Sequence, residues 1–423
     1  MRPDSKINKY EHKKVNTANN DKIKLYQSKI DSYQKLKTQE NDINLEAGLQ
    51  KPKKISLAQY ELDIDTDPIK TIGYGTDHRD HDLVLMDFDR RAARDDDVVI
   101  LILFCGVCHS DWHVILNEWK NTKYPMIVGH EITGIVVKVG QSVKKFKIND
   151  RVAVGPNYNS CRKCHQCKTG HEQYCENDVT ETYNMPDRKI SDDLKPTGPI
   201  TYGGYSNIIV VSEHFVFKLP DDASLDAVAP LLCAGVTMYT PLKELKIGKG
   251  SKVGIAGIGG LGHIGIKIAR KIGAEVIALT RTQEKLSDAI ALGASESLLM
   301  SDTDAVKLHE NTCDLIIDTI PFNHDITPYL NLLKINGGIL WIVGSFFTIA
   351  TDFDIVNRKG KIIRGSSTAG TIDTQEFLNF CIKENLYPEV EIINIRDINK
   401  THHYLVTSKV RYRYVIDMTS IYK

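Results

Sequence analysis

The stretch Lys252-Val-Gly-Ile-Ala256, followed by Gly257-Ile-Gly-Gly-Leu-Gly262, decides how the second half of the chain folds. The first five residues read as a buried strand, and a helical pattern over Leu261–Ile272 begins where the glycines end. A glycine-rich turn between a strand and a helix lets backbone N–H groups and the helix N-terminus surround a pyrophosphate. The stretch therefore predicts a dinucleotide-binding loop formed by Gly257, Gly259, Gly260, Leu261 and Gly262.

The chain on both sides of this loop alternates between strand-like and helical runs. Such alternation is typical of a doubly wound parallel sheet with helices on its faces. We therefore expect an α/β, Rossmann-type domain over residues 236–368. Its further strands are predicted at Glu275–Thr280, Leu315–Asp318 and Ile339–Val343, and its further helices at Gln283–Leu292 and Ile326–Leu333.

The strand after the glycine loop ends at Thr280, 18 residues after Gly262. An NAD site needs an Asp or Glu at this point to bind the ribose 2′-hydroxyl. The sequence instead has Thr280-Arg281-Thr282 and then Lys285. Hydroxyls and cations suit a 2′-phosphate, so these residues favour NADP(H) as the cofactor. Even if Arg281 and Lys285 are merely solvated, the missing acid argues against NAD.

The first half of the chain has short strands separated by Gly and Pro, which indicates a β-rich, barrel-like domain. Residues 176–204 are polar and turn-rich, and we expect a long loop there. The tail from about residue 369 should rejoin this first domain. Strands are predicted at Asp97–Phe104, Ile132–Val139, Arg151–Gly155, Ile208–Val211, Phe215–Leu219 and Tyr412–Met418, and helices at Leu225–Ala234 and Thr374–Glu384.

The stretch from Gly106 to Glu131 carries the residues of an open zinc site. It contains Gly106-Val-Cys-His-Ser-Asp-Trp-His and Pro-Met-Ile-Val-Gly-His-Glu, so that Cys108 and His130 offer a thiolate and an imidazole. A third ligand should lie elsewhere, and Cys233 is the candidate. Three protein ligands leave the fourth position of zinc free for an alcohol or water oxygen, whose pKa the metal lowers. Glu131 is predicted either to contact the zinc ligands without binding the metal itself, or to act as a transient fourth ligand when the site is empty.

Three more residues of this stretch have candidate roles. Asp111 is placed to orient a ligand imidazole by a hydrogen bond. Ser110 and His113 can pass a proton from the substrate, through the cofactor ribose, to bulk water. The alternatives are an ordinary solvated acid for Asp111, a turn hydroxyl for Ser110 and a surface side chain for His113.

Four cysteines crowd into the segment Cys161-x2-Cys164-x2-Cys167-x7-Cys175. Four thiolates at such spacing can close a tetrahedral shell around zinc, which leaves no open position and indicates a structural role. The alternative is free or disulfide-bonded cysteines. An odd total of nine cysteines in a chain without a secretion signal favours metal binding. We therefore expect two zinc ions per chain.

Composition excludes several classes of function. The 423 residues suit two domains, and 54 Lys plus Arg balance 54 Asp plus Glu, so no charge excess favours nucleic acid or a membrane surface. No apolar run reaches the roughly 20 residues of a membrane helix, and the first 30 residues lack the apolar core of a signal peptide. We expect a cytoplasmic protein. Residues 1–66 read as a polar, disordered extension; a short helical stripe there comprises Ile23, Tyr26, Ile30 and Tyr33.

Over about residues 69–423 the chain resembles the zinc-containing medium-chain alcohol dehydrogenases. Within them it looks most like the cinnamyl alcohol dehydrogenase group and its broad-range aldehyde reductases. The resemblance is carried by the two zinc stretches, by the glycine loop and by several shorter segments. These are Tyr202-Gly-Gly-Tyr, Ala229-Pro-Leu-Leu-Cys-Ala-Gly235 and Val410-Arg-Tyr-Arg-Tyr-Val-Ile-Asp417.

The resemblance implies a GroES-like β-barrel catalytic domain, formed by residues 69–235 and 369–423, beside the Rossmann domain. It implies that Cys108, His130 and Cys233 bind the catalytic zinc, with Glu131 adjacent, and that the four clustered cysteines bind the structural one. It places His109, and Arg413 from the C-terminal strand, against the cofactor pyrophosphate. It also implies a homodimer or homotetramer that acts on a small alcohol or aldehyde.

Two features depart from this family: the extension before about Ile69, for which we expect no counterpart, and the long loop Asp178–Pro199. Trp112, Trp119 and Phe346 could line an aromatic pocket, and Trp119 is the one expected to face the cleft. We expect reversible hydride transfer between NADP(H) and a primary alcohol/aldehyde pair, with broad or cinnamyl-type specificity.

Three alternatives remain open from the sequence. An NAD-linked polyol or secondary-alcohol dehydrogenase would have an acid at position 280. A zinc-free quinone reductase of the same superfamily would lack Cys108 and the cysteine cluster. A non-catalytic zinc-binding scaffold protein would have a broken catalytic set, whereas here the set is intact.

Overall fold

The protein is described here by a computed structural model that covers residues 62, 64–190, 193–344, 349, 351, 353–406 and 411–423. Most of the predicted extension 1–66, including its helical stripe Ile23, Tyr26, Ile30 and Tyr33, lies outside these residues. So do Phe346 and Val410.

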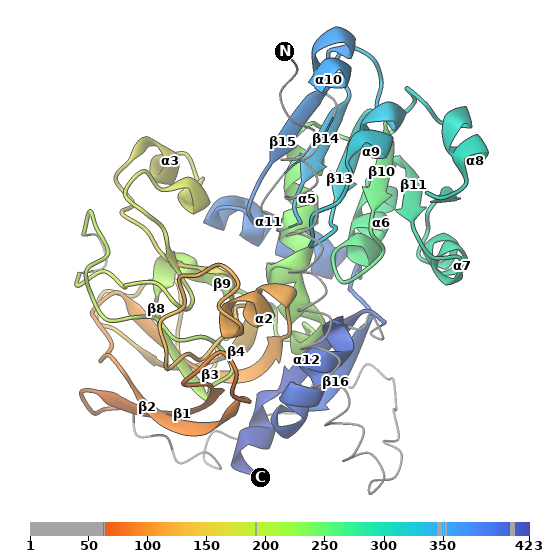
Figure 1. Cartoon of the computed structure of the whole chain (residues 1–423). Helices are drawn as coiled ribbons and strands as arrows, with labels where there is room; N and C mark the ends of the chain where they lie inside the picture. Colours follow the sequence, from red (N-terminus) through yellow and green to blue (C-terminus); the bar gives the residue numbers. More distant parts are fainter. Residues whose placement is uncertain are drawn as a thin grey trace, which may run out of the picture. The chain divides into compact units, whose positions relative to one another are not determined.

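Six parallel strands form the sheet of the C-terminal half, in the order β12-β11-β10-β13-β14-β15 (Figure 1). The order runs outward in both directions from the neighbours β10 and β13, so the predicted doubly wound sheet is confirmed. Apart from the first residues of β10 and β11, the central strands are buried, as expected of strands covered on both faces. The bounds are β10 (Lys252–Ala256), β11 (Glu275–Thr280), β12 (Glu296–Leu299), β13 (Leu315–Asp318), β14 (Ile339–Ile342) and β15 (Ile362–Gly365).

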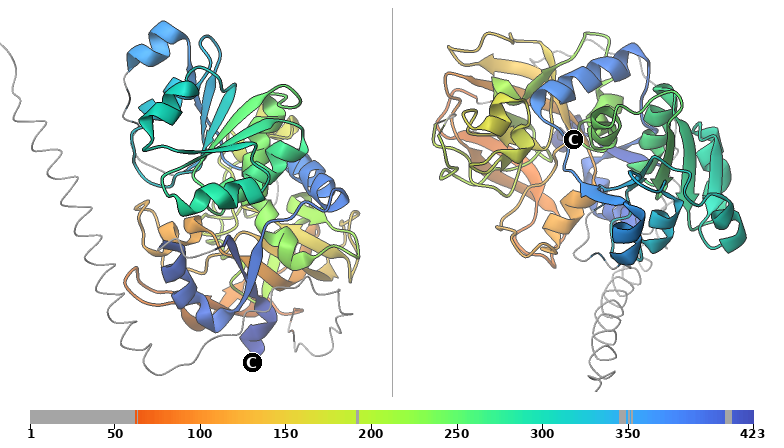
Figure 2. Two further views of the ribbon diagram at one scale, coloured as in Figure 1. Left: turned by 90° about the vertical axis from the view of Figure 1, so that its right-hand side faces the viewer. Right: turned by 90° about the horizontal axis from the view of Figure 1, so that it is seen from above.

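The helices that alternate with these strands in the sequence pack against the sheet, as Figure 2 shows. The α6 helix carries apolar residues that are buried along one face, including Ile264 and Ile268, and it leaves Arg270 and Lys271 exposed at its end. The bounds are α5 (Ala234–Glu244), α6 (Gly262–Lys271), α7 (Glu284–Ala291), α8 (Thr303–Leu308), α9 (Thr327–Leu332), α10 (Phe353–Lys359) and α11 (Thr371–Lys383).

The N-terminal half contributes most of a seven-stranded sheet with the path β16-β17-β3-β4-β5-β9, in which β8 also pairs with β3. The strand near the C-terminus, β17, pairs with β3, so the tail predicted to rejoin the first domain adds a strand to this sheet. The bounds are β3 (Asp97–Gly106), β4 (Ile132–Val139), β5 (Arg151–Val154), β8 (Ile208–Ser212), β9 (Val216–Lys218), β16 (Val390–Asn394) and β17 (Arg413–Asp417).

Two further pairs of strands and several short helices complete this half. The region 176–204 is mainly loop, as predicted, but it contributes β7 to a small sheet with β6. The bounds are β1 (Ile69–Gly75), β2 (Val84–Arg90), β6 (Asn157–Asn159), β7 (Thr180–Glu181), α2 (His109–Ile115), α3 (His165–Lys168), α12 (Ile398–Val406) and the 3-10 turns η3 (Glu172–Tyr174), η4 (Glu213–Phe215), η6 (Ile395–Asp397) and η7 (Met418–Tyr422).

The single helix predicted at Leu225–Ala234 is wrong. The structure has α4 (Leu225–Val228), the 3-10 turn η5 (Ala229–Leu232) and then α5. Pro230 has no N–H group to continue an α-helix, and Cys233 has φ −119° and ψ −72°, which breaks the path between η5 and α5. The break places Cys233 at the N-terminus of α5.

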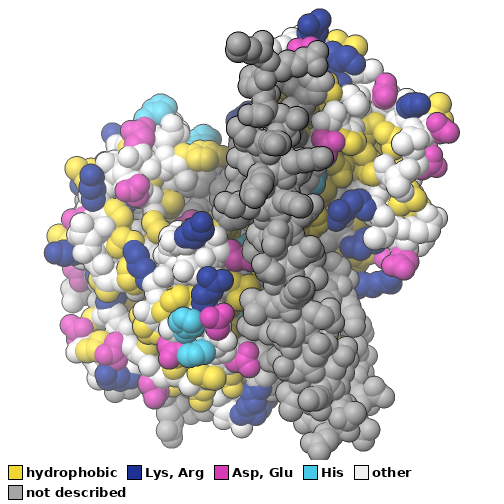
Figure 3. All heavy atoms as spheres, in the orientation of Figure 1, with side chains coloured by type: hydrophobic (Ala, Val, Ile, Leu, Met, Phe, Trp, Pro, Cys, Tyr) yellow, Lys and Arg dark blue, Asp and Glu magenta, His cyan; other side chains and the backbone are white. Residues whose placement is uncertain are grey.

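The two sheets share one apolar core. Its largest cluster includes Leu101 of β3, Ile255 of β10 and Phe377 of α11, all at most 1% exposed. On the face shown in Figure 3, side chains of both charge signs are interspersed among the described residues. Within the described part of the chain no single helix is long and apolar enough to cross a membrane; the bent pair Leu225–Leu232 and Ala234–Glu244 passes by length and composition alone.

Candidate active site

The glycine loop joins the end of β10 to the start of α6. Gly257 has φ +86°, a backbone conformation that only glycine adopts readily. A side chain on Gly262 would meet the carbonyl oxygen of Gly257 at 1.9 Å, whereas one on Gly259 would meet nothing within 4 Å. A side chain on Gly260 would meet the Arg413 guanidinium at 2.8 Å. The loop is therefore tightly turned, open at Gly259 and in contact with Arg413.

The residues predicted to recognise the 2′-phosphate follow directly on β11. Thr280 is 4% exposed, and its hydroxyl accepts a hydrogen bond from the Thr282 N–H at 3.2 Å. The Arg281 guanidinium lies over the Phe322 ring, 4.9 Å from its centre. Lys285 donates to the Ile258 carbonyl at 2.8 Å, and burial lowers its pKa. The cation of Lys285 thus lies at the glycine loop in this structure.

Four predicted ligands come together from three separate segments. Cys108 precedes α2, His130 and Glu131 precede β4, and Cys233 precedes α5. One ligand atom from each lies within 4.8 Å of all the others. A hydrogen bond with Cys233 and the neighbouring His130 hold the pKa of Cys108 well below its usual range. Two sulfurs, an imidazole and a carboxylate at this separation fit a zinc ion.

Asp111 connects this cluster to its surroundings and is 0% exposed. Its Oδ1 lies 3.1 Å from His130 Nδ1 and accepts from the Gly129 N–H at 3.1 Å. Its Oδ2 accepts from the Cys108 N–H at 3.0 Å and from the Tyr205 hydroxyl at 3.1 Å. Because Nδ1 of His130 is engaged by Asp111, Nε2 is the ring nitrogen free to bind a metal.

Tyr183 and Tyr205 were not predicted as site residues. The Tyr183 hydroxyl lies 3.1 Å from His130 Nδ1, beside the Asp111 contact. Tyr183 lies within the long loop region and Tyr205 directly follows it, where no periodic pattern marks which side chains turn inward. The Tyr202-Gly-Gly-Tyr205 segment was a signal for one of them, because a side chain on Gly203 or Gly204 would collide with residues 128–132.

Arg413 pairs with Glu131 across the site, although 282 residues separate them in sequence. Arg413 is 3% exposed and Glu131 is 0% exposed. Burial raises the pKa of Glu131 to about 7, against the opposing effect of Arg413. Glu131 Oε1 accepts a hydrogen bond from the Arg413 guanidinium, whereas Oε2 has no hydrogen-bond partner among the described residues. Arg413 thus contacts both the glycine loop and the ligand cluster.

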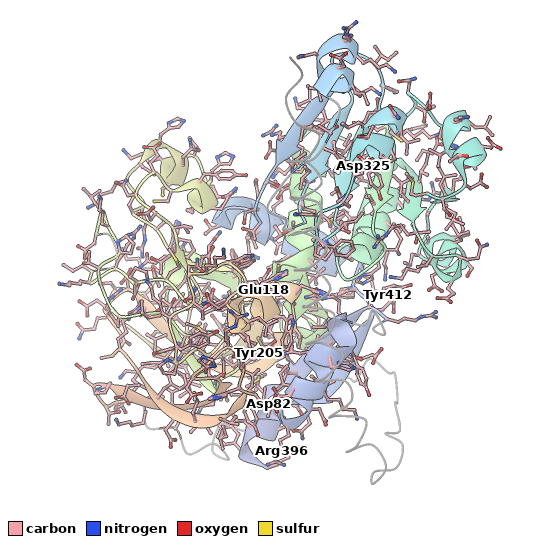
Figure 4. The ribbon with its side chains drawn as sticks, in the orientation of Figure 1. Asp82, Glu118, Tyr205, Asp325, Arg396 and Tyr412 are labelled. Carbon is pink, nitrogen blue, oxygen red and sulfur yellow. The ribbon has the colours of Figure 1, made fainter. Side chains whose placement is uncertain are left out.

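The proposed proton path begins in α2. Ser110 is half-buried two residues after Cys108, and His113 lies one turn further along. His113 Nδ1 lies 2.6 Å from Glu118 Oε2, a contact that was not predicted. Among the described residues, His113 Nε2 has no hydrogen-bond partner. Figure 4 labels Glu118 and Tyr205, which both belong to the lobe of the larger mixed sheet. Glu118 gives His113 a proton acceptor or a counter-charge.

Two other candidates pack near this path. The His109 ring lies 6.4 Å from that of His113, and burial lowers the pKa of His109. Trp119 is partly buried, with its ring 5.4 Å from that of His113. Trp112 instead packs on His402 at 4.8 Å. The cleft-facing role of Trp119 stays a prediction.

The four clustered cysteines form the second group, with their sulfurs all within 4.8 Å of one another. The backbone N–H groups of Lys163 and Cys164 donate to Cys161 Sγ at 3.5 and 3.4 Å. Burial raises the pKa of Cys161, but these N–H groups outweigh it and bring that pKa to about 6. All nine cysteines are free of disulfides. The donor set fits zinc in a closed shell.

The comparisons with known proteins agree with this geometry. Residues 94–221 match the alcohol dehydrogenase GroES-like domain, and residues 260–383 match the zinc-binding dehydrogenase domain. A probable zinc-type alcohol dehydrogenase-like protein of Acanthamoeba polyphaga mimivirus is 41% identical over 99% of each chain. The chain belongs to the zinc-containing medium-chain alcohol dehydrogenases. The predicted GroES-like and Rossmann fold class is thereby confirmed.

Within these alcohol dehydrogenases, the chain falls in the cinnamyl alcohol dehydrogenase-like group. A probable mannitol dehydrogenase of Medicago sativa is 41% identical over 84% of this chain and 96% of its own length. A cinnamyl alcohol dehydrogenase structure from Sorghum bicolor aligns with a TM-score of 0.78 and 36% identity over 83% of this chain and 98% of that one. CAD from Helicobacter pylori, complexed with NADP(H), aligns with a TM-score of 0.77 and 41% identity over 83% and 99%.

The expectation that the N-terminal extension has no counterpart is wrong. The alignment with the mimivirus alcohol dehydrogenase-like protein spans 99% of both chains, so it includes this segment. The plant relative and both solved structures cover 83–84% of this chain. The extension is thus shared with one relative of the same length.

Proposed function

We propose that this alcohol dehydrogenase transfers a hydride between NADP(H) and a primary alcohol/aldehyde pair, acting mainly as an aldehyde reductase. One observation carries the proposal. Arg413 contacts both the glycine loop and Glu131, so it joins the predicted cofactor site to the cluster of Cys108, His130, Glu131 and Cys233. NADPH pools are usually kept reduced, which favours the reductive direction.

The residues of the cluster fit a catalytic zinc, which Cys108, His130 and Cys233 would hold. When bound, zinc supplies a Lewis acid that polarises the substrate oxygen, and the reduced nicotinamide supplies the hydride. Asp111 fixes the His130 ring so that Nε2 meets the metal. Glu131 has one oxygen without a partner, which suits a temporary ligand when no substrate is present.

The proton that the alcohol product needs would come from α2. Ser110 lies in the first turn of α2, two residues after Cys108, and His113 lies one turn further along the helix. Glu118 accepts from or pairs with His113 at 2.6 Å and so keeps the ring oriented. Ser110 would donate to the product oxygen and be restored from His113.

NADP(H) is proposed over NAD(H) because β11 ends in Thr280 rather than in an acid. Arg281, Thr282 and Lys285 follow and would hold the 2′-phosphate. The H. pylori relative was solved with NADP(H), and a relative from Mycolicibacterium smegmatis, 41% identical over 78% of this chain and 93% of its own length, is named as NADP-dependent. The second zinc, at Cys161, Cys164, Cys167 and Cys175, is proposed as structural.

The predicted substrates are aldehydes of broad or cinnamyl type. A second candidate is a polyhydroxylated substrate, because relatives from two plants are named mannitol dehydrogenases and because of Glu181. Glu181 lies two residues before Tyr183, is exposed, and has no hydrogen-bond or ion-pair partner for its carboxylate among the described residues. A free carboxylate at that place suits hydroxyl groups better than an aromatic ring.

The test is an NADPH-oxidation screen of the zinc-loaded protein with cinnamaldehyde, benzaldehyde, hexanal and mannose, with and without a zinc chelator. We expect turnover of at least one class and its loss with the chelator. Cys108→Ser should abolish turnover while NADPH binding, followed by fluorescence titration, stays within about twofold. Retained turnover in Cys108→Ser would refute the zinc mechanism, and fewer than two zinc ions per chain would remove one of the two sites.

A further inference from the structure

His263 lies at the start of α6, directly after the glycine loop, and no role has been given to it so far. It is 0% exposed. Its Nδ1 lies 3.2 Å from the carbonyl oxygen of Gly259, and its Nε2 lies 3.3 Å from the backbone nitrogen of Glu389. Glu389 precedes β16, so this one ring joins the cofactor-binding loop to the C-terminal part of the chain.

The partners of the ring fix its protonation. The Glu389 N–H can only donate, so Nε2 must accept and carry no proton. The Gly259 carbonyl can only accept, so Nδ1 must carry the proton and donate. His263 is therefore neutral in one tautomer. Burial and the nearby Arg413 agree with this, because they lower the pKa of His263 to about 3.

The bond to Gly259 also sets the direction of a loop amide. The Gly259 carbonyl accepts from the His263 side chain and from its backbone N–H at 3.1 Å, so it points toward α6. In a planar trans peptide the C=O and N–H groups point in opposite directions. The N–H of Gly260 therefore points away from α6.

The same ring lies against the strand that carries Arg413. The His263 ring stacks on Tyr412 with 4.7 Å between centres and 10° between planes. Figure 4 labels Tyr412 where this C-terminal segment meets the lobe of the parallel sheet. Lys267, one turn further along α6, donates to the Tyr387 carbonyl at 2.5 Å and pairs with Glu389 at 2.9 Å.

We propose that His263 is a positioning residue for dinucleotide binding, which holds the Gly259–Gly260 peptide so that its N–H faces the pyrophosphate. Its stacking on Tyr412 places the ring beside the strand that carries Arg413. The inference requires that the chain binds a nicotinamide dinucleotide, but it does not depend on the choice between NADP(H) and NAD(H).

The test uses two substitutions, each of which can keep one of the two hydrogen bonds of the His263 ring. His263→Asn retains a donor where Nδ1 lies and can still bond Gly259. His263→Gln retains an acceptor near the place of Nε2 and can still bond the Glu389 N–H. Dissociation constants of NADPH and NADH are measured by fluorescence titration without substrate, and kcat and KM are measured with an aldehyde that the wild type reduces.

We expect His263→Gln to weaken dinucleotide binding about fivefold to tenfold, which corresponds to one hydrogen bond. His263→Asn should stay within about twofold of the wild type, and kcat at saturating cofactor should stay within twofold in both. Equal dissociation constants for the two variants, whether weakened or unchanged, would overturn the proposal.

Lys267→Gln is the matched control, because Lys267 contacts Tyr387 and Glu389 but not the glycine loop. It should lower the thermal midpoint without changing the dissociation constant. If it weakens binding as much as His263→Gln does, the effect belongs to the C-terminal segment and the loop role is overturned. A wild type that binds neither dinucleotide would instead refute the proposed function itself.

Discussion

At the scale of single residues, Thr280 offers the sharpest test of cofactor choice. It is nearly buried at the carboxyl end of β11, and its hydroxyl accepts the Thr282 N–H. An aspartate can accept the same N–H, so Thr280→Asp adds a negative charge with little structural change. Repulsion of the 2′-phosphate should lower the NADPH-to-NADH ratio of kcat/KM by about tenfold to a hundredfold.

The control is Thr280→Ser, which keeps the hydroxyl and adds no charge. Its ratio should stay within about twofold of the wild type. If the ratio also stays unchanged in Thr280→Asp, recognition of the phosphate lies at other residues.

Glu181 provides a second prediction at this scale, on substrate class. Burial raises the pKa of Tyr183 well above its usual range, and the charge of Glu181 adds to this effect. The exposed carboxylate of Glu181 thus acts on a residue that contacts His130. For Glu181→Gln we expect KM for mannose to rise about fivefold while KM for cinnamaldehyde stays the same. A parallel change for both aldehydes would show that Glu181 does not select substrates.

The sequence could predict the residues whose chemistry is rare, together with Asp111 beside them, but not most of the residues that support them. Cysteines at metal spacing and a histidine within Gly-His-Glu are recognisable because few other uses explain them. Glu118, Tyr183 and Tyr205 are common residue types in turns, and only the folded chain shows that they meet His113, His130 and Asp111. The cofactor role of Arg413 was predicted, but its pairing with Glu131 was not.

At the scale of elements, a carboxylate of residues 161–176, here called the cysteine lobe, contacts the start of α11. Glu172 is 1% exposed, lies 2.8 Å from His214 Nε2 and accepts from the Thr371 N–H at 3.0 Å and hydroxyl at 2.9 Å. It therefore places a negative charge at the N-terminus of α11, where helices favour one. Despite the opposing effect of burial, its bonds to His214 and to the Thr371 N–H lower the pKa of Glu172 to about 2.

Glu172→Gln should destabilise the protein by about 2 kcal/mol, because a buried charged acceptor with three partners is replaced by a neutral amide. Urea unfolding at neutral pH measures this. Glu176→Gln, at an exposed position in the same lobe, should change the stability by less than 0.5 kcal/mol, roughly the range of surface substitutions. Equal effects of the two variants would show that Glu172 does not anchor α11.

Four strands have the predicted bounds, β4 in the mixed sheet and β10, β11 and β13 in the parallel sheet, since each is a run of apolar residues bounded by Gly or polar residues. The edge strands β12 and β15 of the parallel sheet were not predicted. α2 was missed because its residues serve the site and show no amphipathic pattern; Asp111 caps it by accepting from the Cys108 N–H. β16 was missed because it is a half-exposed edge strand, which single-sequence patterns indicate poorly.

At the scale of the whole molecule, two buried neutral histidines make stability depend on pH. Burial lowers the pKa of His263 to about 3 and that of His402 to about 4. The nearby charges of Arg413 and Lys267 lower the pKa of His263 further. At His402, His109 also lowers the pKa, whereas Asp111 opposes the decrease. The unfolded chain binds protons near pH 6.5, whereas the native state does not. Stability is therefore complete above about pH 6.5 and falls as the pH decreases toward 4, by about 1.4 kcal/mol per unit for each group.

His402→Leu should remove one of these two contributions. Neither ring nitrogen of His402 has a hydrogen-bond partner among the described residues, so leucine sacrifices no bond there. Urea unfolding at pH 7.5 and 5.5 should show a smaller loss of stability in the variant than in the wild type. The same loss in both proteins would mean that His402 does not set the acid sensitivity.

The pairing of β17 with β3 has a consequence for the synthesis of the protein. The register joins Val415 to Gly106, so the ribosome must make more than 300 further residues before β3 gains this neighbour. Until then Glu131 lacks its cation, and one strand edge stands open to other nascent chains. Translation that stops before Arg413 thus yields a polypeptide with every zinc ligand but an incomplete site. Such a product would lack the Glu131–Arg413 ion pair and the β17 edge of the sheet.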